Sequence, residues 1–210
     1  IGDAYRVGFT VISDPEIRSS QFLRNPDFTT AQRTRFYELL YSAGTDYGFT
    51  PLRGALSKVG RYYGKRMPGQ TYDPMRYSCQ RNYALLSTDG YWNIGQSGYP
   101  GLETASYGPL ALDGSPVGNQ DGSENRPRLD VAGALDSLAD VAQYYWVTDL
   151  RTEPSMPDKQ NLVTYTLGLG VRGTLTWTRD YETQASGDFY DLVHNRKNWP
   201  VPTGTVTRSN

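Results

Sequence analysis

Cysteine and histidine are nearly missing from this sequence, which holds one of each among 210 residues. A single cysteine, Cys79, excludes an internal disulfide framework and a paired-cysteine metal site. We expect Cys79 to be a buried, inert side chain; the alternative is a thiol that pairs with a residue outside this sequence. His194 is the one candidate general base, and neither a Gly-x-Ser-x-Gly nor a His-Glu-x-x-His motif accompanies it. We therefore expect no enzymatic activity and a surface position for His194.

Long apolar runs are also missing. No stretch approaches the roughly 18 residues of a membrane span, and the N-terminus lacks the basic and apolar regions of a signal peptide. We expect a soluble piece whose export signal, if it has one, lies outside this sequence.

Neither sign of charge is in excess. Lys and Arg number 21 against 22 Asp and Glu, which gives a formal net charge of -1. Without a basic field, neither nucleic acid nor an anionic membrane is favoured as a partner.

Glycine, proline and tyrosine, by contrast, are abundant. The chain holds 22 Gly, 13 Pro and 17 Tyr, and its mean hydropathy of -0.62 is on the polar side. Such a composition is typical of a regular core with many turns and aromatic loops. The length fits one large domain, which we expect over residues 1–197, with a Gly- and Pro-containing linker over residues 198–210.

Hydrophobic periodicity predicts three strands and three helices. Strands are expected at residues 5–12, 82–88 and 162–169, and helices at 30–41, 50–63 and 131–147, with a loop at 13–28. Thr30 and Thr50 are candidate helix caps, and Pro51 suits a first helical position. The predicted buried stripes of the three helices are Phe36, Leu39 and Leu40; Leu52, Ala55, Leu56 and Val59; and Leu135, Leu138, Ala139, Ala142 and Tyr145.

Strands that alternate with helices of this length predict right-handed crossovers and a mainly parallel sheet flanked by helices. The predicted fold class is therefore α/β. In such sheets ligands bind outside the carboxyl ends of the strands.

Residues 91–128 are predicted to be a long loop insertion, because they show neither a period of 2 nor one of 3.6. The insertion begins just after a predicted strand, so we expect it near the carboxyl end of the sheet. Deletion of residues 96–117 should then spare the fold and weaken partner binding. The aromatic residues expected to form a binding surface there are Tyr91, Trp92, Tyr99 and Tyr107.

Oxygen-bearing side chains in the same insertion offer a candidate structural Ca²⁺ site. Asp113, Asn119, Asp121 and Glu124 lie close together in a Gly-rich stretch. The stretch lacks the twelve-residue spacing of an EF-hand loop. A solvated loop is the alternative.

A second candidate metal site combines Thr50, which opens a predicted helix, with Asp89, which follows the predicted strand at 82–88. A hydroxyl and a carboxylate at the carboxyl end of the sheet suit a hard cation such as Mg²⁺ or Ca²⁺. The alternatives are a helix cap at Thr50 and a turn at Asp89 and Gly90.

Several ordered motifs resemble a known family. The segments GFTPLRGAL at 48–56 and ALLSTDG at 84–90 resemble the threonine loop and a hydrophobic strand of von Willebrand factor A domains. More specifically, the chain resembles the N-terminal domain of the PilC/PilY proteins of type IV pili. The segments that carry this likeness are YSCQRN (77–82), TDGYWN (88–93), VGNQDG (117–122), SLADVAQYY (137–145), TDLR (148–151), VTYTLGLG (163–170) and NWP (198–200).

The resemblance implies a von Willebrand factor A-like, non-enzymatic module of pilus assembly, twitching motility and adhesion, at the pilus tip or cell surface after export through the periplasm. Its implied partners are minor pilins or other pilus components, a host or surface ligand, and the protein's own further N- and C-terminal segments, including a β-propeller. A structural tip subunit held by partner chains, without receptor binding, is the alternative.

The family pattern also implies a strand carrying Asp-x-Ser-x-Ser that supplies the main metal ligands. No such motif occurs here at a strand end, so we expect the sequence to begin at the second strand of the fold. Thr50 and Asp89 alone are then expected to leave the site without metal.

Overall fold

The computed structural model describes residues 2–43, 50–90, 108–122, 135–169, 173–194, 196–197 and 200. Helices and strands both occur in this part of the chain, and no helix within it is long and apolar enough to cross a membrane. The elements, in chain order, are β1 Phe9–Thr10, β2 Phe22–Leu23, α1 Thr30–Ser42, α2 Leu52–Tyr63, β3 Asn82–Thr88, α3 Leu138–Val147, β4 Leu162–Gly168, a 3₁₀ turn η1 Tyr181–Thr183 and α4 Asp188–Val193.

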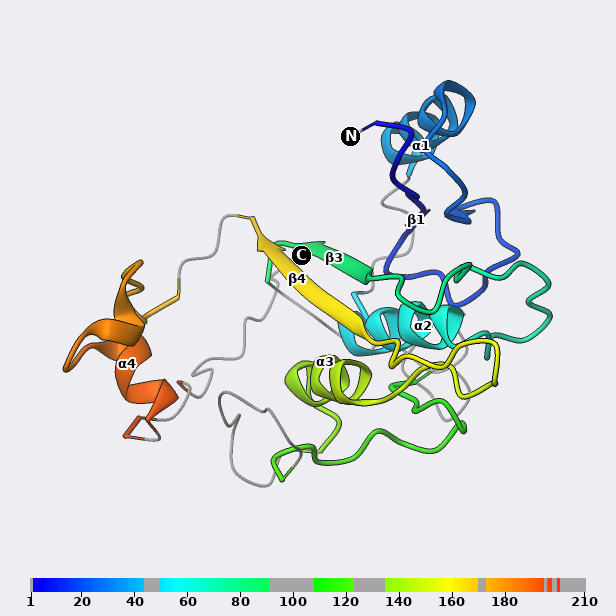
Figure 1. Ribbon diagram of the computed structural model, residues 1–210. Coiled ribbons are helices and arrows are strands. Elements are labelled where there is room, and N and C mark those ends of the chain that lie inside the picture. The colour runs from blue at the N-terminus through cyan, green and yellow to red at the C-terminus, as the bar shows by residue number, and fades with distance from the viewer. Residues whose placement is uncertain are drawn as a thin grey trace.

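The core lies between a parallel pair of strands and two helices. β3 and β4 pair in parallel from Asn82 opposite Leu162 to Thr88 opposite Gly168, and α2 and α3 lie on the same side of this pair (Figure 1). Both strands were predicted. The predicted bounds of β3 match the structure, and the predicted β4 was one residue longer than the observed strand. Alternation along β3 turns Ala84 and Leu86 into the core, which also contains Leu56, Val117, Val141, Tyr145, Leu150 and Leu162.

Helix α2 confirms the predicted stripe, because Leu52, Ala55 and Leu56 are buried and Val59 packs against the core. The predicted cap is wrong by one residue: the helix begins at Leu52 and Pro51 is the N-cap. Proline at this position fixes the backbone before the first turn, without a side-chain hydrogen bond.

Helix α3 is shorter than predicted. It begins at Leu138, where Ser137 caps it through a reciprocal pair of hydrogen bonds with Asp140. Asp136 has a φ of +55°, which a continuing helix does not allow. Residues 131–134 lie outside the described residues. The predicted stripe is also partly wrong, because Leu135 and Ala139 are exposed while Tyr145 is fully buried.

The N-terminal region contains two short strands and a helix, and hydrogen bonds from Lys58 to Thr10 and from Tyr62 to Asn25 join it to α2. Only Phe9–Thr10 of the predicted strand at residues 5–12 is β-structure, and it pairs antiparallel with Phe22–Leu23 of the predicted loop. Helix α1 packs on this pair through Phe36, whose ring centroid lies 5.8 Å from that of Phe9. Its cap is Thr29, one residue before the predicted Thr30. Leu39 is buried as predicted, but Leu40 is largely exposed.

The described part of the predicted insertion, residues 108–122, is a loop that belongs to the core. Leu110 and Val117 are buried, and the Ser57 hydroxyl both donates to the Leu110 carbonyl at 2.8 Å and accepts from its N–H at 2.9 Å. The Tyr145 hydroxyl donates to the same carbonyl. Burial of these residues opposes the expectation that residues 96–117 can be deleted with the fold intact, which stays a prediction because residues 96–107 lie outside the described residues.

Two single residues were singled out in the sequence. Cys79 is an exposed free thiol, so the expectation of a buried side chain is wrong; it lies in a surface turn closed by a hydrogen bond from the Gln80 N–H to the Tyr77 carbonyl. His194 is exposed at the end of α4, as predicted. Of the predicted linker at 198–210, only residue 200 lies within the described residues.

Candidate functional site

The face of the β3–β4 pair that turns away from α2 and α3 carries exposed apolar side chains. We call this surface the open sheet face and define it by Tyr83, Leu85, Tyr165, Leu167 and Leu169, whose exposed fractions run from 48% to 70%. Exposed fractions this high are unusual for large apolar side chains gathered on one surface.

Strand alternation and register place these residues together. Successive side chains of a strand point to opposite faces, so burial of Ala84 and Leu86 turns Tyr83 and Leu85 outward. Leu85 is the register partner of Tyr165, and Ser87 that of Leu167. The rings of Tyr83 and Tyr165 lie 6.1 Å apart across the strands. The result is one continuous apolar surface of aromatic and leucine side chains.

Buried amides hold the amino ends of the two strands in register. The Asn82 side-chain amide donates to the Asn161 carbonyl at 3.2 Å, and the Gln160 amide donates to the Ser78 carbonyl at 2.6 Å. Asn82 and Gln160 are fully buried, and their amides also donate to the Gln80 and Asp158 carbonyls. The open sheet face thus lies on two strands whose amino ends are joined to neighbouring segments by buried side-chain hydrogen bonds.

The predicted metal residues Thr50 and Asp89 each lie beside an element of the core. Thr50 is half-buried just before α2, and Asp89 is exposed just after β3. The Gly90 N–H donates to the Thr88 hydroxyl at 3.1 Å, and Gly90 has a φ of +89°, so the turn predicted as the alternative is present. Whether the two side chains share a cation stays a prediction, and two oxygen donors alone do not make a cage for one.

The predicted calcium residues stabilise two separate turns of their loop. The Asp113 carboxylate accepts from the Ser115 hydroxyl and N–H, and these hydrogen bonds lower its pKa. The Asn119 side chain accepts from the Asp121 N–H at 2.7 Å. Glu124 lies outside the described residues. Among the residues that the structure describes, no group of three His, Cys, Asp or Glu side chains could hold a metal ion. A calcium site therefore stays a prediction.

Sequence reasoning missed the carboxylate that organises this loop. Asp140 is fully buried and accepts from the Gln120 N–H at 2.8 Å and the Ser137 N–H at 2.9 Å. It thus joins residues 118–120 to the start of α3. The signal was present as Ser137-x-x-Asp140, a variant of the helix capping box.

The predicted aromatic binding surface cannot be placed, because Tyr91, Trp92, Tyr99 and Tyr107 lie outside the described residues. An aromatic pair that the structure does place at the surface of the β3–β4 sheet is Tyr83 and Tyr165. Period-2 alternation places each tyrosine on a definite face of its predicted strand, but it does not predict that this face is exposed.

Comparison with known proteins shows similarity to type IV pilus biogenesis factors. The chain is 31% identical over 214 residues to "Type IV pilus biogenesis factor PilY1" of Pseudomonas aeruginosa strain PAO1, which covers 86% of this chain and 17% of that protein. The PilY1 of strain PAK is 30% identical over 207 residues, covering 83% of this chain and 17% of that protein. No family model and no solved structure matches the chain.

The chain spans 17% of the length of these curated relatives, so the similarity concerns one segment of a much longer protein. It nevertheless extends over most of the present chain. This similarity supports a relationship with the PilC/PilY family.

Proposed function

We propose that this chain is an assembly and adhesion module of a type IV pilus-associated protein, that it works at the pilus tip or cell surface, and that it binds other polypeptides through the open sheet face. In this proposal its fold is von Willebrand factor A-like, and it has no catalytic activity. The names of the relatives support the pilus connection. The open sheet face supports the binding role.

The observation that carries the proposal is a parallel pair of strands with one apolar face exposed. Parallel sheets are ordinarily covered on both faces, whereas antiparallel sheets tolerate one wet face. Here α2 and α3 cover one face, while Leu85 on the other is 70% exposed. Contiguous exposed apolar surface of this kind marks a protein interaction site.

The proposed partners are minor pilins or other pilus components, together with a host or surface ligand. A structural tip subunit that is held by partner chains and binds no receptor is the second candidate. It is favoured by the same open sheet face, because an apolar surface suits permanent assembly as well as ligand capture.

A pull-down experiment with purified minor pilins and surface ligands, with and without Mg²⁺ or Ca²⁺, tests the proposal. The variant carries Leu85→Ser and Tyr165→Ser, which remove the centre of the open sheet face. We expect it to lose pilin retention at least tenfold, because buried apolar and aromatic anchors dominate interface energies.

The matched control is Tyr41→Ser on α1, where an 82% exposed tyrosine lies outside the open sheet face. It should leave retention unchanged. Thermal unfolding of each variant checks that the fold is intact. Equal retention by the double variant and the parent would refute the binding role of this face, and retention of pilins without any surface ligand would favour the structural candidate.

A further inference from the structure

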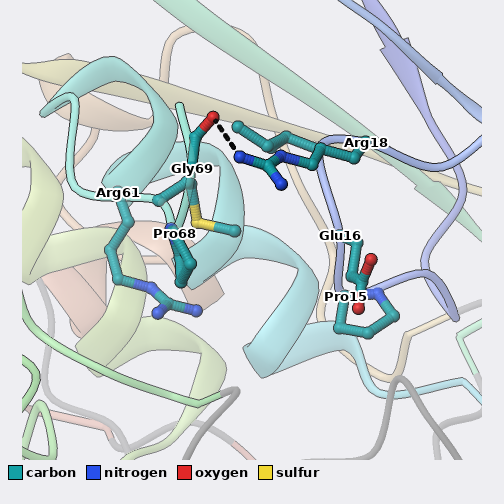
Figure 2. Close-up of a pocket in the computed structure, with 8 residues that line it drawn as sticks. Pro15, Glu16, Arg18, Arg61, Pro68 and Gly69 are labelled. Carbon is teal, nitrogen blue, oxygen red and sulfur yellow. Dashed lines mark hydrogen bonds between the residues drawn. The ribbon is translucent and has the colours of Figure 1, made fainter. Parts of the chain in front are cut away.

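Charged groups of both signs share the cavity between the β1–β2 connection and the end of α2, which has a volume of about 260 Å³. Figure 2 shows Arg61 on one side of it and Glu16 on the other. Arg18 donates to the Gly69 carbonyl at 3.1 Å, the bond drawn dashed. Because cations and a carboxylate line the same space, the cavity points to no ligand of a particular charge. A group of exposed arginines in the same N-terminal region does.

Charge is distributed unevenly along this chain. Residues 1–76 hold eleven Lys and Arg against seven Asp and Glu, whereas residues 77–210 hold ten against fifteen. A nearly neutral chain therefore has a basic first third and an acidic remainder. Such an asymmetry indicates that one region has an electrostatic partner that the overall charge conceals.

Four arginines of the basic region gather where the first residues of the chain meet the start of α1. Arg6 is bridged to Asp27 across two antiparallel segments, and Arg76 donates to both oxygens of Asp27 at 3.2 and 3.3 Å. The Gln32 side chain on α1 donates to the Arg24 carbonyl at 2.8 Å, and Arg33 follows Gln32 directly. We call Arg6, Arg24, Arg33 and Arg76 the arginine surface.

One carboxylate compensates half of this surface. Asp27 pairs with Arg76 and lies 3.9 Å from the Nε of Arg6. Arg24 and Arg33 are exposed, and in the described part of the chain neither guanidinium forms an ion pair with a carboxylate. The positive charge of these two arginines is therefore directed to solvent.

Aromatic rings hold the same two guanidinium groups in place. The Cζ of Arg24 lies 5.0 Å from the ring centroid of Tyr72, and the Cζ of Arg33 lies 5.6 Å from that of Phe28. The Tyr72 hydroxyl in turn accepts from Arg6 at 2.5 Å. A guanidinium stacked on a ring keeps its N–H groups available at its edge, and it loses less side-chain freedom on binding.

We propose that the arginine surface binds an acidic segment of a partner polypeptide, with Arg24 and Arg33 each contacting a side-chain carboxylate. A planar guanidinium matches a carboxylate with two parallel hydrogen bonds. Tyr5, 65% exposed, accepts through its carbonyl from the Phe28 N–H and adds an aromatic contact beside these arginines. Arginine and tyrosine are the residue types that dominate interface energies.

The acidic remainder of the chain favours a short acidic segment over nucleic acid. A long polyanion that covered the arginine surface would extend over neighbouring acidic side chains and be repelled by them. Nucleic-acid sites also use many phosphate contacts from Lys and Arg, whereas only two arginines here lack a carboxylate partner within the described residues. The arginine surface shares no residue with the open sheet face and does not depend on the proposed function.

The test measures binding of a rhodamine-labelled peptide of five Glu-Ala repeats to the full chain by fluorescence anisotropy. A peptide of five Gln-Ala repeats is the neutral blank. We expect the acidic peptide to bind, the neutral peptide not to bind, and the acidic peptide to bind more weakly as salt is added, because exposed charges are screened.

Variants of the two stacked arginines locate the binding site. Arg24→Gln should weaken binding of the acidic peptide about fivefold and Arg33→Gln about threefold, as expected for exposed charge pairs. Arg24→Lys should recover only part of the loss, because lysine keeps the charge but lacks the planar fork. Both arginines are exposed, so the fold should stay intact, which thermal unfolding checks.

Arg179→Gln is the matched control. It removes the same charge from an exposed arginine just before η1, and Figure 1 places η1 and α4 apart from the N-terminal strands. Binding of the acidic peptide should be unchanged in this variant.

Three results would overturn the assignment. The first is equal binding of the acidic and neutral peptides. The second is binding of the acidic peptide that Arg24→Gln and Arg33→Gln leave unchanged, or that Arg179→Gln weakens as much. The third is tighter binding of a DNA oligonucleotide with ten phosphates than of the acidic peptide, which would assign the surface to nucleic acid.

Discussion

At the scale of single residues, Gly60 decides how closely the two core helices approach. A Cβ at this position would lie 2.3 Å from two ring carbons of Tyr145 on α3. Alanine ordinarily stabilises a helix interior by roughly 0.5–1 kcal/mol relative to glycine. Here we expect Gly60→Ala to lower the free energy of unfolding by about 1–3 kcal/mol, because overpacking a buried contact outweighs that gain.

Urea unfolding of Gly60→Ala at neutral pH measures this change. Gly173→Ala is the control, because an added Cβ there meets no atom within 4 Å, and its effect should stay within about 0.5 kcal/mol. A Gly60→Ala protein as stable as the parent would show that α2 and α3 can separate without cost.

Lys58 predicts an unusual dependence of stability on pH. Burial lowers its pKa from 10.5 to about 8, an effect that the nearby Asp14 opposes and Arg61 reinforces. Between these two pH values the unfolded chain binds more protons than the folded chain, so stability rises with pH. The slope for one group is at most about 1.4 kcal/mol per pH unit. Burial of the charged Lys58 ammonium thus lowers the free energy of unfolding below pH 8, and this loss shrinks as the pH rises above 8.

Urea unfolding at pH 7.5, 8.5 and 9.5 checks this rise. Lys58→Met should flatten it, while Lys65→Met, with a side chain 46% exposed, should not. The series ends below pH 10 because of Tyr63, whose pKa burial raises from 10.0 to about 12. Above pH 10 this tyrosine ionises in the unfolded chain but not in the folded chain, which lowers stability. An unaltered slope in Lys58→Met would contradict the prediction.

At the scale of elements, Arg151 joins the connection after α2 to the connection after α3. Its guanidinium is 6% exposed and bonds both oxygens of Asp73 at 2.7 Å, and its Nε donates to Glu153 at 2.6 Å. Partial burial raises the pKa of Asp73, but the hydrogen bonds from Arg151 and the Met75 N–H, together with the charges of Arg151 and Lys65, outweigh it, so the pKa is lowered. The stabilisation is therefore present above the unfolded pKa of aspartate and lost as the pH falls.

We expect Arg151→Met to lower the free energy of unfolding by about 2 kcal/mol at pH 7, below the 3–5 kcal/mol of a fully buried pair because Asp73 is 32% exposed. Arg151→Lys should recover less than half, since lysine lacks the planar fork. Arg35→Met, which breaks the exposed pair with Glu38, should cost about 0.5 kcal/mol or less. Equal losses for Arg151→Met at pH 7 and pH 2 would contradict the carboxylate linkage.

The elements that the sequence predicted well are those whose local pattern and tertiary role agree. β3 and α2 were found within two residues because their apolar positions follow one clean period. α3 was extended too far, because Leu135 continues an apolar stripe while Asp136 adopts a positive φ that no periodicity reveals. β2 was missed because a two-residue strand leaves almost no pattern.

The candidate sites were less predictable, because they depend on distant neighbours. Leu85 lies in a continuous apolar run, and such a run is also typical of a strand that is buried on both faces. The sequence therefore does not predict that Leu85 is exposed. The arginine surface depends on contacts such as that of Arg24 with Tyr72, which lie far apart in the sequence and leave no local motif. Asp89, by contrast, directly follows a strand as predicted, and Thr50 lies two residues before the first residue of α2, since both positions follow closely from the elements themselves.

At the scale of the whole molecule, the described elements form a one-sided layer. α2 and α3 cover one face of the β3–β4 pair, the β1, β2 and α1 unit lies to one side, and η1 with α4 lies apart from this core (Figure 1). Such an arrangement leaves both the open sheet face and the carboxyl end of the sheet accessible to other polypeptide segments. Metal binding at that end would depend on how many oxygen ligands those segments supply.

The last prediction therefore concerns a divalent cation at the carboxyl end of the sheet. Thr50 and Asp89 offer two oxygen donors, whereas Ca²⁺ takes 6–8 and Mg²⁺ exchanges its waters reluctantly. We expect calorimetric titration of this chain with either ion to show only weak binding there. Asp89→Ala should abolish that binding and leave the far-ultraviolet circular dichroism unchanged, because Asp89 is exposed beyond the end of β3. Asp121→Ala, in a different loop, should not affect it. Metal binding that persists in Asp89→Ala would assign Thr50 and Asp89 only to the helix start and the turn.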